Sequence, residues 1–210
     1  MSQQPASAGE QELPVTRQLR GPQALALADL TAIYDELQFV LGCCERLLGE
    51  LRRGDEQDAL TTESLWVAAL SAYARCFRSR ESGVALSVTD LSETGVKGDV
   101  VQWHHALGRL RNFMVEGVAN PREEFFVGVS QAAGEPVGIV VTSIIRPKVD
   151  ETTVRQTGQL ALELTTLVDK RIKQRQEAVF AVARELTGAE FDKLDPIDVD
   201  WSPAQQPASS

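Results

Sequence analysis

Residues 121–147 read PREEFFVGVSQAAGEPVGIVVTSIIRP, and this stretch decides the fold. Two runs rich in β-branched and aromatic residues, 125–130 and 139–145, flank a segment with the composition of a turn. Such a pair of runs predicts an antiparallel β-hairpin over about residues 125–145. A proline lies just outside each run, so a helix is not expected to extend into the hairpin from either side.

The segments on both sides of this hairpin have helical rather than strand periodicity. Apolar residues recur at spacings of three and four in four stretches, about 23–53, 61–80, 99–117 and 150–188. The long connection at 81–98 is rich in glycine and acids and is expected to be mostly loop. We therefore predict a mainly α fold, a helical bundle of about four main helices with one inserted β-hairpin.

The chain length and the distribution of polar residues predict one domain with two tails. Residues 1–22 and 196–210 are rich in Gln, Ser, Pro and Ala without apolar periodicity, and we expect both to be flexible. The single helical domain then covers residues 23–195. Trp201 is unusual in the second tail and could dock on the domain or contact a partner.

The composition favours a cytoplasmic protein without a membrane segment. The N-terminus lacks the apolar segment of a secretory signal, and no run approaches the length needed to span a bilayer. Cys43 and Cys44 are adjacent, and Cys76 has no partner at a zinc-binding spacing. We expect these cysteines to be buried as small hydrophobes, and we expect no metal site.

The net charge of −9 disfavours RNA or DNA as a partner, because the overall field repels phosphates. The strongest basic cluster consists of Lys170, Arg171, Lys173 and Arg175. We expect these side chains to form a solvated helix face, although they could form a local phosphate-binding patch.

Two short segments carry a resemblance to a known family. Residues 110–117 read LRNFMVEG, and residues 65–77 read LWVAALSAYARCF. The first resembles the Arg-Asn motif of the HEPN superfamily, helical proteins of toxin–antitoxin and abortive-infection systems. The second is similar to the second helix of bacterial HEPN-like proteins, in which a hairpin and a long final helix also follow the Arg-Asn segment. By layout the resemblance covers about residues 25–190.

The resemblance implies a site from which one residue is missing. Active members are metal-independent ribonucleases with the pattern Arg, a polar residue, several further residues and then His. Arg111 and Asn112 match its start, but Gly117 occupies the position where the His is expected. Arginine cannot transfer protons near neutral pH. His104 could act as a displaced base, or His104 and His105 could be helix residues without a role.

Arg75 and Arg111 also have a structural interpretation. A buried arginine needs a carboxylate or several carbonyls to offset its desolvation. Glu45 flanks the apolar stripe of the first helix and is the acid that we expect to pair with either arginine. We predict that Arg75, Arg111 and Asn112 converge on one polar pocket between the second and third helices, either as an internal network or as a ligand or RNA site.

The resulting functional hypothesis is a non-catalytic HEPN-like protein that binds a protein or nucleic-acid partner, in phage defence or toxin–antitoxin biology. One alternative is a metal-independent ribonuclease with a displaced catalytic base. A second is an interaction or assembly protein unrelated to nucleic acid. We expect a homodimer and no cofactor, and we leave open whether the chain is an enzyme.

Overall fold

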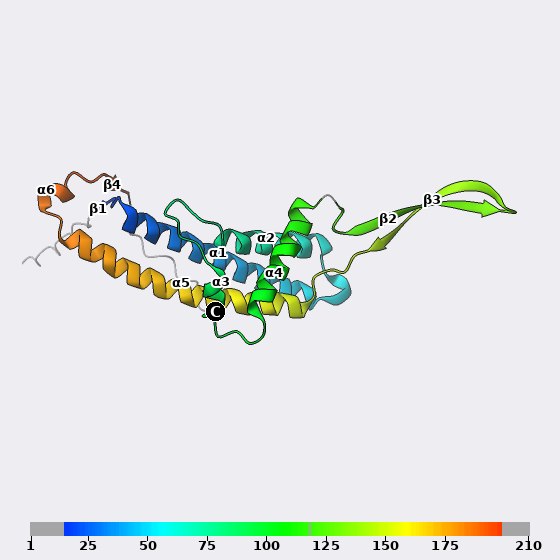
Figure 1. Ribbon diagram of the computed structural model, residues 1–210, viewed down its shortest axis with the longest axis horizontal. Coiled ribbons are helices and arrows are strands. Elements are labelled where there is room, and N and C mark those ends of the chain that lie inside the picture. The colour runs from blue at the N-terminus through cyan, green and yellow to red at the C-terminus, as the bar shows by residue number, and fades with distance from the viewer. Residues whose placement is uncertain (1–14, 118, 199–210) are drawn as a thin grey trace, which may run out of the picture.

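The computed structural model describes residues 15–117 and 119–198 of the chain (Figure 1). This part is mainly helical with one long hairpin, which confirms the predicted class. No helix in it combines the length and the apolar character needed to cross a membrane. The four main helices are α1 (Pro22–Leu51), α2 (Ala59–Cys76), α4 (Val100–Arg111) and α5 (Glu151–Arg184). Short elements lie between or after them: η1 (Gly54–Glu56), α3 (Val88–Ser92), the π-helical turn η2 (Asn112–Glu116) and α6 (Gly188–Phe191).

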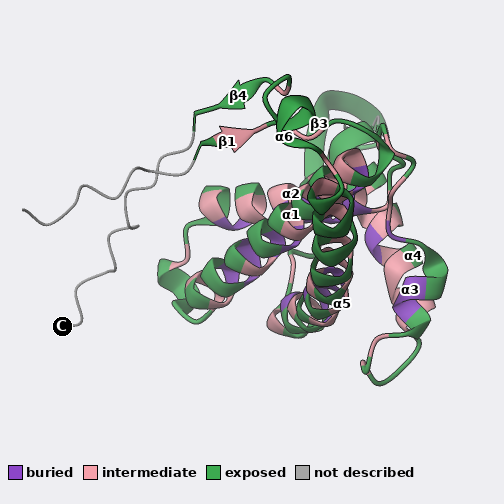
Figure 2. Cartoon of the chain, turned by 90° about the vertical axis from the view of Figure 1, so that its left-hand side faces the viewer, coloured by how far each residue is buried: buried purple, intermediate pink, exposed green. Residues whose placement is uncertain are grey.

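The core forms where α1 packs against both α2 and α5 (Figures 1 and 2). Apolar residues at helical spacing on α1 and α5 face each other, as their sequence periodicity predicts. Each fully buried Leu, Ile or Val contributes about 1.5–3 kcal/mol relative to an exposed one. The large aliphatic residues that are fully buried on these two helices are Ile33, Leu37, Val40, Leu47, Val154, Leu160, Leu164 and Val168.

The three cysteines are buried and free, as the sequence predicts. Burial raises the pKa of the Cys44 thiol and of the Cys76 thiol to about 12 in each case. Both therefore stay protonated near neutral pH and fill space in the core as small hydrophobes.

The hairpin projects from the bundle as an arm (Figure 1). Its strands, β2 (Glu123–Ala132) and β3 (Glu135–Ile145), are antiparallel and longer than predicted. The predicted turn covered residues 131–138, but only Ala133 and Gly134 separate the strands. Both have positive φ, 52° and 88°, which is the backbone twist that suits a two-residue hairpin turn.

The two ends of the described chain are paired with each other. β1 (Thr16–Arg17) and β4 (Pro196–Ile197) form a short antiparallel ladder. The Arg17 guanidinium donates to the carbonyl oxygens of Asp192 and Leu194 at 3.1 and 2.9 Å. The predicted tails, 1–22 and 196–210, therefore include residues that are part of the fold, because residues 16–17 and 196–197 pair through their backbones. Backbone pairing of this kind does not require apolar periodicity. Trp201 lies outside the described residues.

Candidate functional site

Arg75 does not belong to a buried pocket. Its guanidinium forms two hydrogen bonds with the carboxylate of Glu36 on α1, at 2.6 and 2.7 Å, and 48% of its side chain is exposed. The hydrogen bonds with Glu36 are the main cause that raises the pKa of Arg75, and the negative charge of Glu36 acts in the same direction. The expectation that Glu45 would be the partner is wrong, because Glu45 is exposed. It follows the buried Cys44 by one residue, and the helical rotation of about 100° per residue carries it away from the core.

Arg111 is held by a local change in helix geometry. Its guanidinium forms an ion pair with Glu116 and also donates to the Asn112 side chain at 3.2 Å. In an α-helix, residues five apart lie about 140° apart around the axis and would not meet. The π-helical turn η2 brings residues i and i+5 together, so Arg111 and Glu116 can pair. Glu116, rather than Glu45, neutralises this arginine.

Gly117 lies at the end of the same turn, and the chain leaves no room there for a side chain. A Cβ at this position would lie 2.6 Å from the carbonyl oxygen of Phe113, which is backbone and cannot rotate away. A histidine at this position would therefore contact the backbone of the same turn. Any side chain at position 117 requires the π-helical turn to shift.

His104 faces α2 rather than Arg111. Its Nδ1 lies 3.0 Å from the Tyr73 hydroxyl, and its ring packs against Phe77 with the centroids 4.3 Å apart. Burial, aided by the nearby His105, lowers the pKa of His104 below its ordinary value. The imidazole is therefore mainly neutral at pH 7. With its proton on Nε2, it can accept a hydrogen bond from the Tyr73 hydroxyl at Nδ1. This arrangement suits a half-buried histidine that packs between α4 and α2.

These residues form three separate arrangements. Arg75 binds α1, His104 contacts α2, and Arg111 is neutralised within its own turn. No hydrogen bond or ion pair between described residues joins Arg75 to Arg111 or Asn112. In the described ranges, no group of three His, Cys, Asp or Glu side chains is placed to hold a metal ion.

The basic cluster of α5 is divided among different partners. Arg171 forms an ion pair with the buried Asp90 of α3, and Lys173 binds Asp169 at 2.6 Å. Burial would raise the pKa of Asp90, but Arg171 and the Ser87 hydrogen bonds together hold it below its usual range. Arg175 donates to the Gln23 side chain. The cluster is thus largely structural, since it connects α5 to α3 and to the start of α1.

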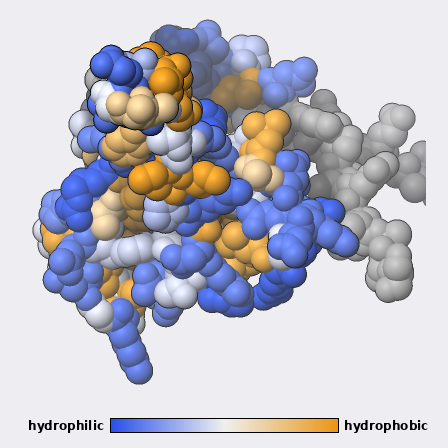
Figure 3. Space-filling view, turned by 90° about the vertical axis from the view of Figure 1, so that its right-hand side faces the viewer, coloured by the Kyte–Doolittle hydropathy of each residue, from blue (hydrophilic) through white to orange (hydrophobic). Residues whose placement is uncertain are grey.

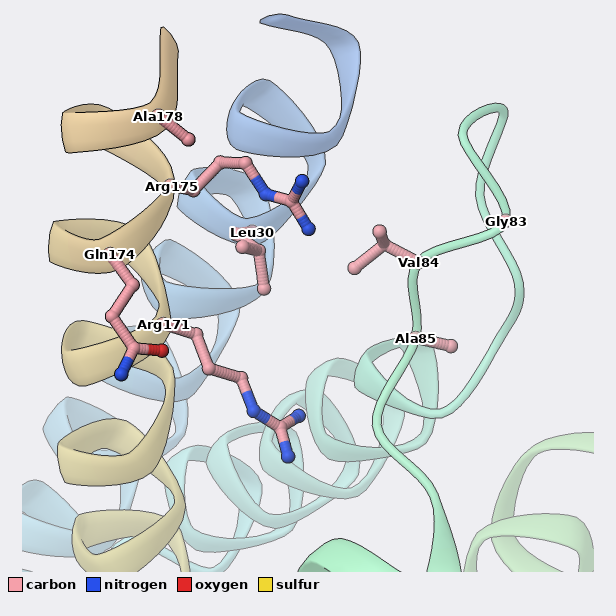
Figure 4. Close-up of a pocket in the computed structure, with 8 residues that line it drawn as sticks. All are labelled: Leu30, Gly83, Val84, Ala85, Arg171, Gln174, Arg175 and Ala178. Atoms are coloured by element: carbon pink, nitrogen blue, oxygen red, sulfur yellow. The ribbon is translucent and has the colours of Figure 1, made fainter. Parts of the chain in front are cut away.

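A shallow pocket of about 530 Å³ lies between α1, α5 and the loop before α3 (Figure 4). Arg171 and Arg175, one helical turn apart, extend across it toward the loop at Val84 and Ala85 (Figure 4). Because Arg171 is already neutralised by Asp90, Arg175 supplies most of the positive charge on this pocket.

The most unusual surface of the described chain is on the hairpin. Residues paired across antiparallel strands share a face, and successive residues alternate between faces. The register of β2 and β3 therefore places six large apolar side chains on one face, each between 57 and 74% exposed. We call them the apolar hairpin face: Phe125, Val127, Val129, Ile139, Val141 and Ile145. Figure 3 views the molecule from the hairpin end, where hydrophobic residues are prominent on the surface.

The opposite face of the hairpin is more polar. It carries Phe126, Val140 and Ile144, but these alternate with glycine, Ser130, Thr142 and Glu124. Over residues 125–145 the only ionisable side chain is Glu135, beside the turn, although 24% of the whole chain is charged. The hairpin therefore offers a partner an apolar surface and almost no charge.

The root of the hairpin is fixed to the bundle. Arg122 forms an ion pair with Glu63 of α2 at 2.8 Å, and Arg146 pairs with Glu124 at 3.3 Å while lying over the Phe113 ring. The arm is thus held at its root, whereas the apolar side chains along its described strands are exposed. The sequence predicts the hairpin but not the exposure of its apolar side chains, since apolar residues at both odd and even positions of 139–145 are typical of a covered sheet.

Comparison of the chain with protein-family profiles, with curated proteins and with solved structures gives no match in any of the three. The HEPN resemblance therefore rests on residues 65–77 and 110–117 and on the order of the elements. Function is best inferred from the chemistry of the surfaces themselves.

Proposed function

We propose that this chain is a non-catalytic, HEPN-like interaction protein that docks onto a protein partner through the apolar hairpin face. The observation that carries the proposal is the set of six apolar side chains left exposed together on one face of the arm. The largest contiguous apolar patch on a typical monomer covers about 300–600 Å² and is often functional, and a patch that continues over both faces of an exposed arm favours an interaction surface. A role in phage defence or toxin–antitoxin biology is part of the proposal through the family resemblance.

The physics of an isolated hairpin supports a partner. A two-stranded hairpin is marginally stable in water, and both of its outer edges offer unpaired N–H and C=O groups. Here the arm contains ten- and eleven-residue strands, and among the described residues it is tied to the bundle at its root, where Arg122 pairs with Glu63. Covering the apolar hairpin face would remove its hydrophobic surface from water, which favours docking.

Protein is a better partner than nucleic acid for this surface. Nucleic-acid binding draws most of its affinity from Lys and Arg contacts with phosphates. Residues 125–145 contain no Lys or Arg, and the chain carries a net charge of −9. Single-stranded nucleic acid could stack on aromatic rings, but the apolar hairpin face has one aromatic side chain, Phe125.

The arrangement around Arg111 favours a non-catalytic chain over the ribonuclease alternative. Cleavage of RNA without metal needs a group that moves the 2′-hydroxyl proton. The partners of Arg111 are Glu116 and Asn112, whereas His104 binds Tyr73. Glu116 also occupies the guanidinium that would otherwise bind a phosphate.

Site-specific photo-crosslinking in the source cells tests the proposal. The full chain would carry a benzophenone amino acid at Val127, on the apolar hairpin face, or at Gln102, an exposed position on α4. We expect a discrete adduct from position 127, with the partner identified by mass spectrometry, and none from position 102. Equal labelling from both positions, or no adduct at 127, would contradict docking through the hairpin.

A further inference from the structure

The hairpin holds half of the large hydrophobic side chains that are exposed in the described chain. The others are spread over the helices and the β1–β4 end, and none of these elements has a comparable run. An apolar sheet face requires an apolar surface of similar shape to cover it. Within the described residues, the surface of this chain that best meets that requirement is the apolar hairpin face of another molecule.

Resting on the proposed function, we infer that the partner is a second copy of this chain and that the two apolar hairpin faces pack against each other. A two-fold axis makes such a contact isologous, which means that the same six side chains of each copy contact those of the other. Two β layers packed in this way interdigitate their side chains about 10 Å apart. The pair of hairpins becomes a small sandwich in which both apolar faces are inside.

Charge fixes the relative direction of the two arms. Parallel arms would bring the Glu135 of one copy, beside its turn, against the Glu135 of the other, and would place the two acidic bundles at the same end. The root carries Arg122 and Arg146 together with Glu123 and Glu124, so antiparallel arms place each Glu135 against a root without excess charge. Antiparallel arms also separate the acidic bundles by about one strand length, roughly 33 Å, well beyond the screening length of about 8–10 Å.

The buried area suits a reversible dimer. Six side chains that are about two-thirds exposed hold roughly 60 Å² of apolar surface each, and two copies therefore cover about 700 Å². Backbone, Ser143 and the tip-to-root contacts add to this, so the total is about 1,000 Å², the lower end for a specific interface. We therefore expect dissociation in the micromolar range.

Substitution of two neighbouring valines tests the inference in the full-length chain. Val141 is on the apolar hairpin face, and Val140 is on the opposite face of the same strand. Sedimentation equilibrium should give about twice the chain mass of 22.9 kDa for the wild type. Val141→Lys should raise the dimer Kd roughly 100-fold or more, because it buries an unpaired charge. Val140→Lys should change it less than about threefold, and circular dichroism should show both variants folded.

Cysteine crosslinking supplies an independent measurement, since the three native thiols are buried. Val141 and its cross-strand neighbour Val127 lie near the middle of the face, where the two-fold axis would pass. Under mild oxidation, Val141→Cys should give a disulfide-linked dimer, whereas Val140→Cys should not.

Two results would overturn the second copy as partner, and another would overturn the packing of the two apolar hairpin faces. A wild-type chain that stays monomeric at high micromolar concentration would exclude it, yet crosslinking to a different protein from position 127 would still support the proposed function. Equal effects of Val141→Lys and Val140→Lys would indicate pairing through strand edges instead. A monomer that sediments with phosphatidylcholine vesicles would indicate a lipid surface as the occupant.

Discussion

The Tyr73 hydroxyl and the Nδ1 atom of His104 lie 3.0 Å apart, so one hydrogen bond ties α2 to α4. The imidazole accepts this proton only in its neutral form. Burial is the main cause of both pKa shifts: it raises the pKa of Tyr73 and lowers the pKa of His104. Protonation of His104 would make Nδ1 a donor to the Tyr73 oxygen and would place a positive charge in this half-buried site, which burial disfavours.

The first prediction concerns the pH dependence of stability. The unfolded chain takes up a proton at His104 near pH 6.5, whereas the folded chain takes it up only at lower pH. The contribution of His104 is thus fully present above about pH 6.5 and decreases as the pH falls below that value. Urea titrations between pH 7.5 and 5.5 should show this loss in the wild type and a flatter profile in His104→Gln. His105→Gln, a change at the exposed neighbour, should keep most of the slope, and an equal flattening in both variants would contradict the assignment.

The second prediction concerns the ion pair between α3 and α5. Asp90 has 8% of its side chain exposed and binds Arg171, and it also completes the capping box of α3 with Ser87. We expect Asp90→Asn to lower the free energy of unfolding by about 2 kcal/mol, a value reduced from the fully buried case because Arg171 is partly exposed. Because the pKa of Asp90 is lowered, its contribution is present above about pH 4 and is lost as the pH falls further. Asp169→Asn, at the exposed pair with Lys173, should have little effect in the same denaturation assay.

The third prediction concerns the turn after Arg111. Gly117→Ala should lower the free energy of unfolding by about 1–3 kcal/mol, because the new Cβ would contact the Phe113 carbonyl oxygen. Gly108→Ala is the matched control on α4, where a Cβ meets no atom within 4 Å, and it should be neutral or stabilise by up to about 1 kcal/mol. Thermal melts of both variants check this. Equal stability of the two would show that the turn is more compliant than its geometry indicates.

The fourth prediction concerns ribonuclease activity. Purified chain incubated with single-stranded and structured RNA in chelator should cleave no faster than its Arg111→Ala variant. The reason is that Glu116 neutralises Arg111 while His104 is engaged by Tyr73. Cleavage that depends on Arg111 would instead support the displaced-base alternative, and His104→Gln would then identify the base.

Local patterns were sufficient to predict the helices and the existence of the hairpin. Periodicity of three and four residues fixes which side of α1 is buried, and the β-branched runs fix the strands. The turn was predicted too wide because Pro136 and Gly138 have the composition of a turn. In the structure Pro136 lies within β3, opposite Gln131 and next to an irregularity in the ladder, where a proline is tolerated.

The polar pairs could not be predicted in the same way. Helical periodicity identifies the buried stripe, but it does not say which neighbouring helix lies beside each flank. The sequence therefore does not distinguish Glu45 from Glu36, the acid that pairs with Arg75 in the structure. The Arg111–Glu116 pair depends on a π-helical turn, which breaks the periodicity used for prediction. The apolar runs of the hairpin are typical of a covered sheet, but the sequence does not reveal that the described part of the chain leaves the apolar hairpin face exposed.

The pairing of β1 with β4 places two labelling sites, near residues 16 and 197, side by side. The β1–β4 pair lies close to α6 near one end of the long axis, and the turn of the β2–β3 hairpin lies at the other end (Figure 1). A fluorophore attached near residue 16 or 197 is therefore held at the end of the molecule opposite the hairpin turn. In a pair joined arm to arm, two such probes would mark the outermost poles of the particle. Energy transfer between them would be weak, whereas probes placed near residue 134 would report each association event directly.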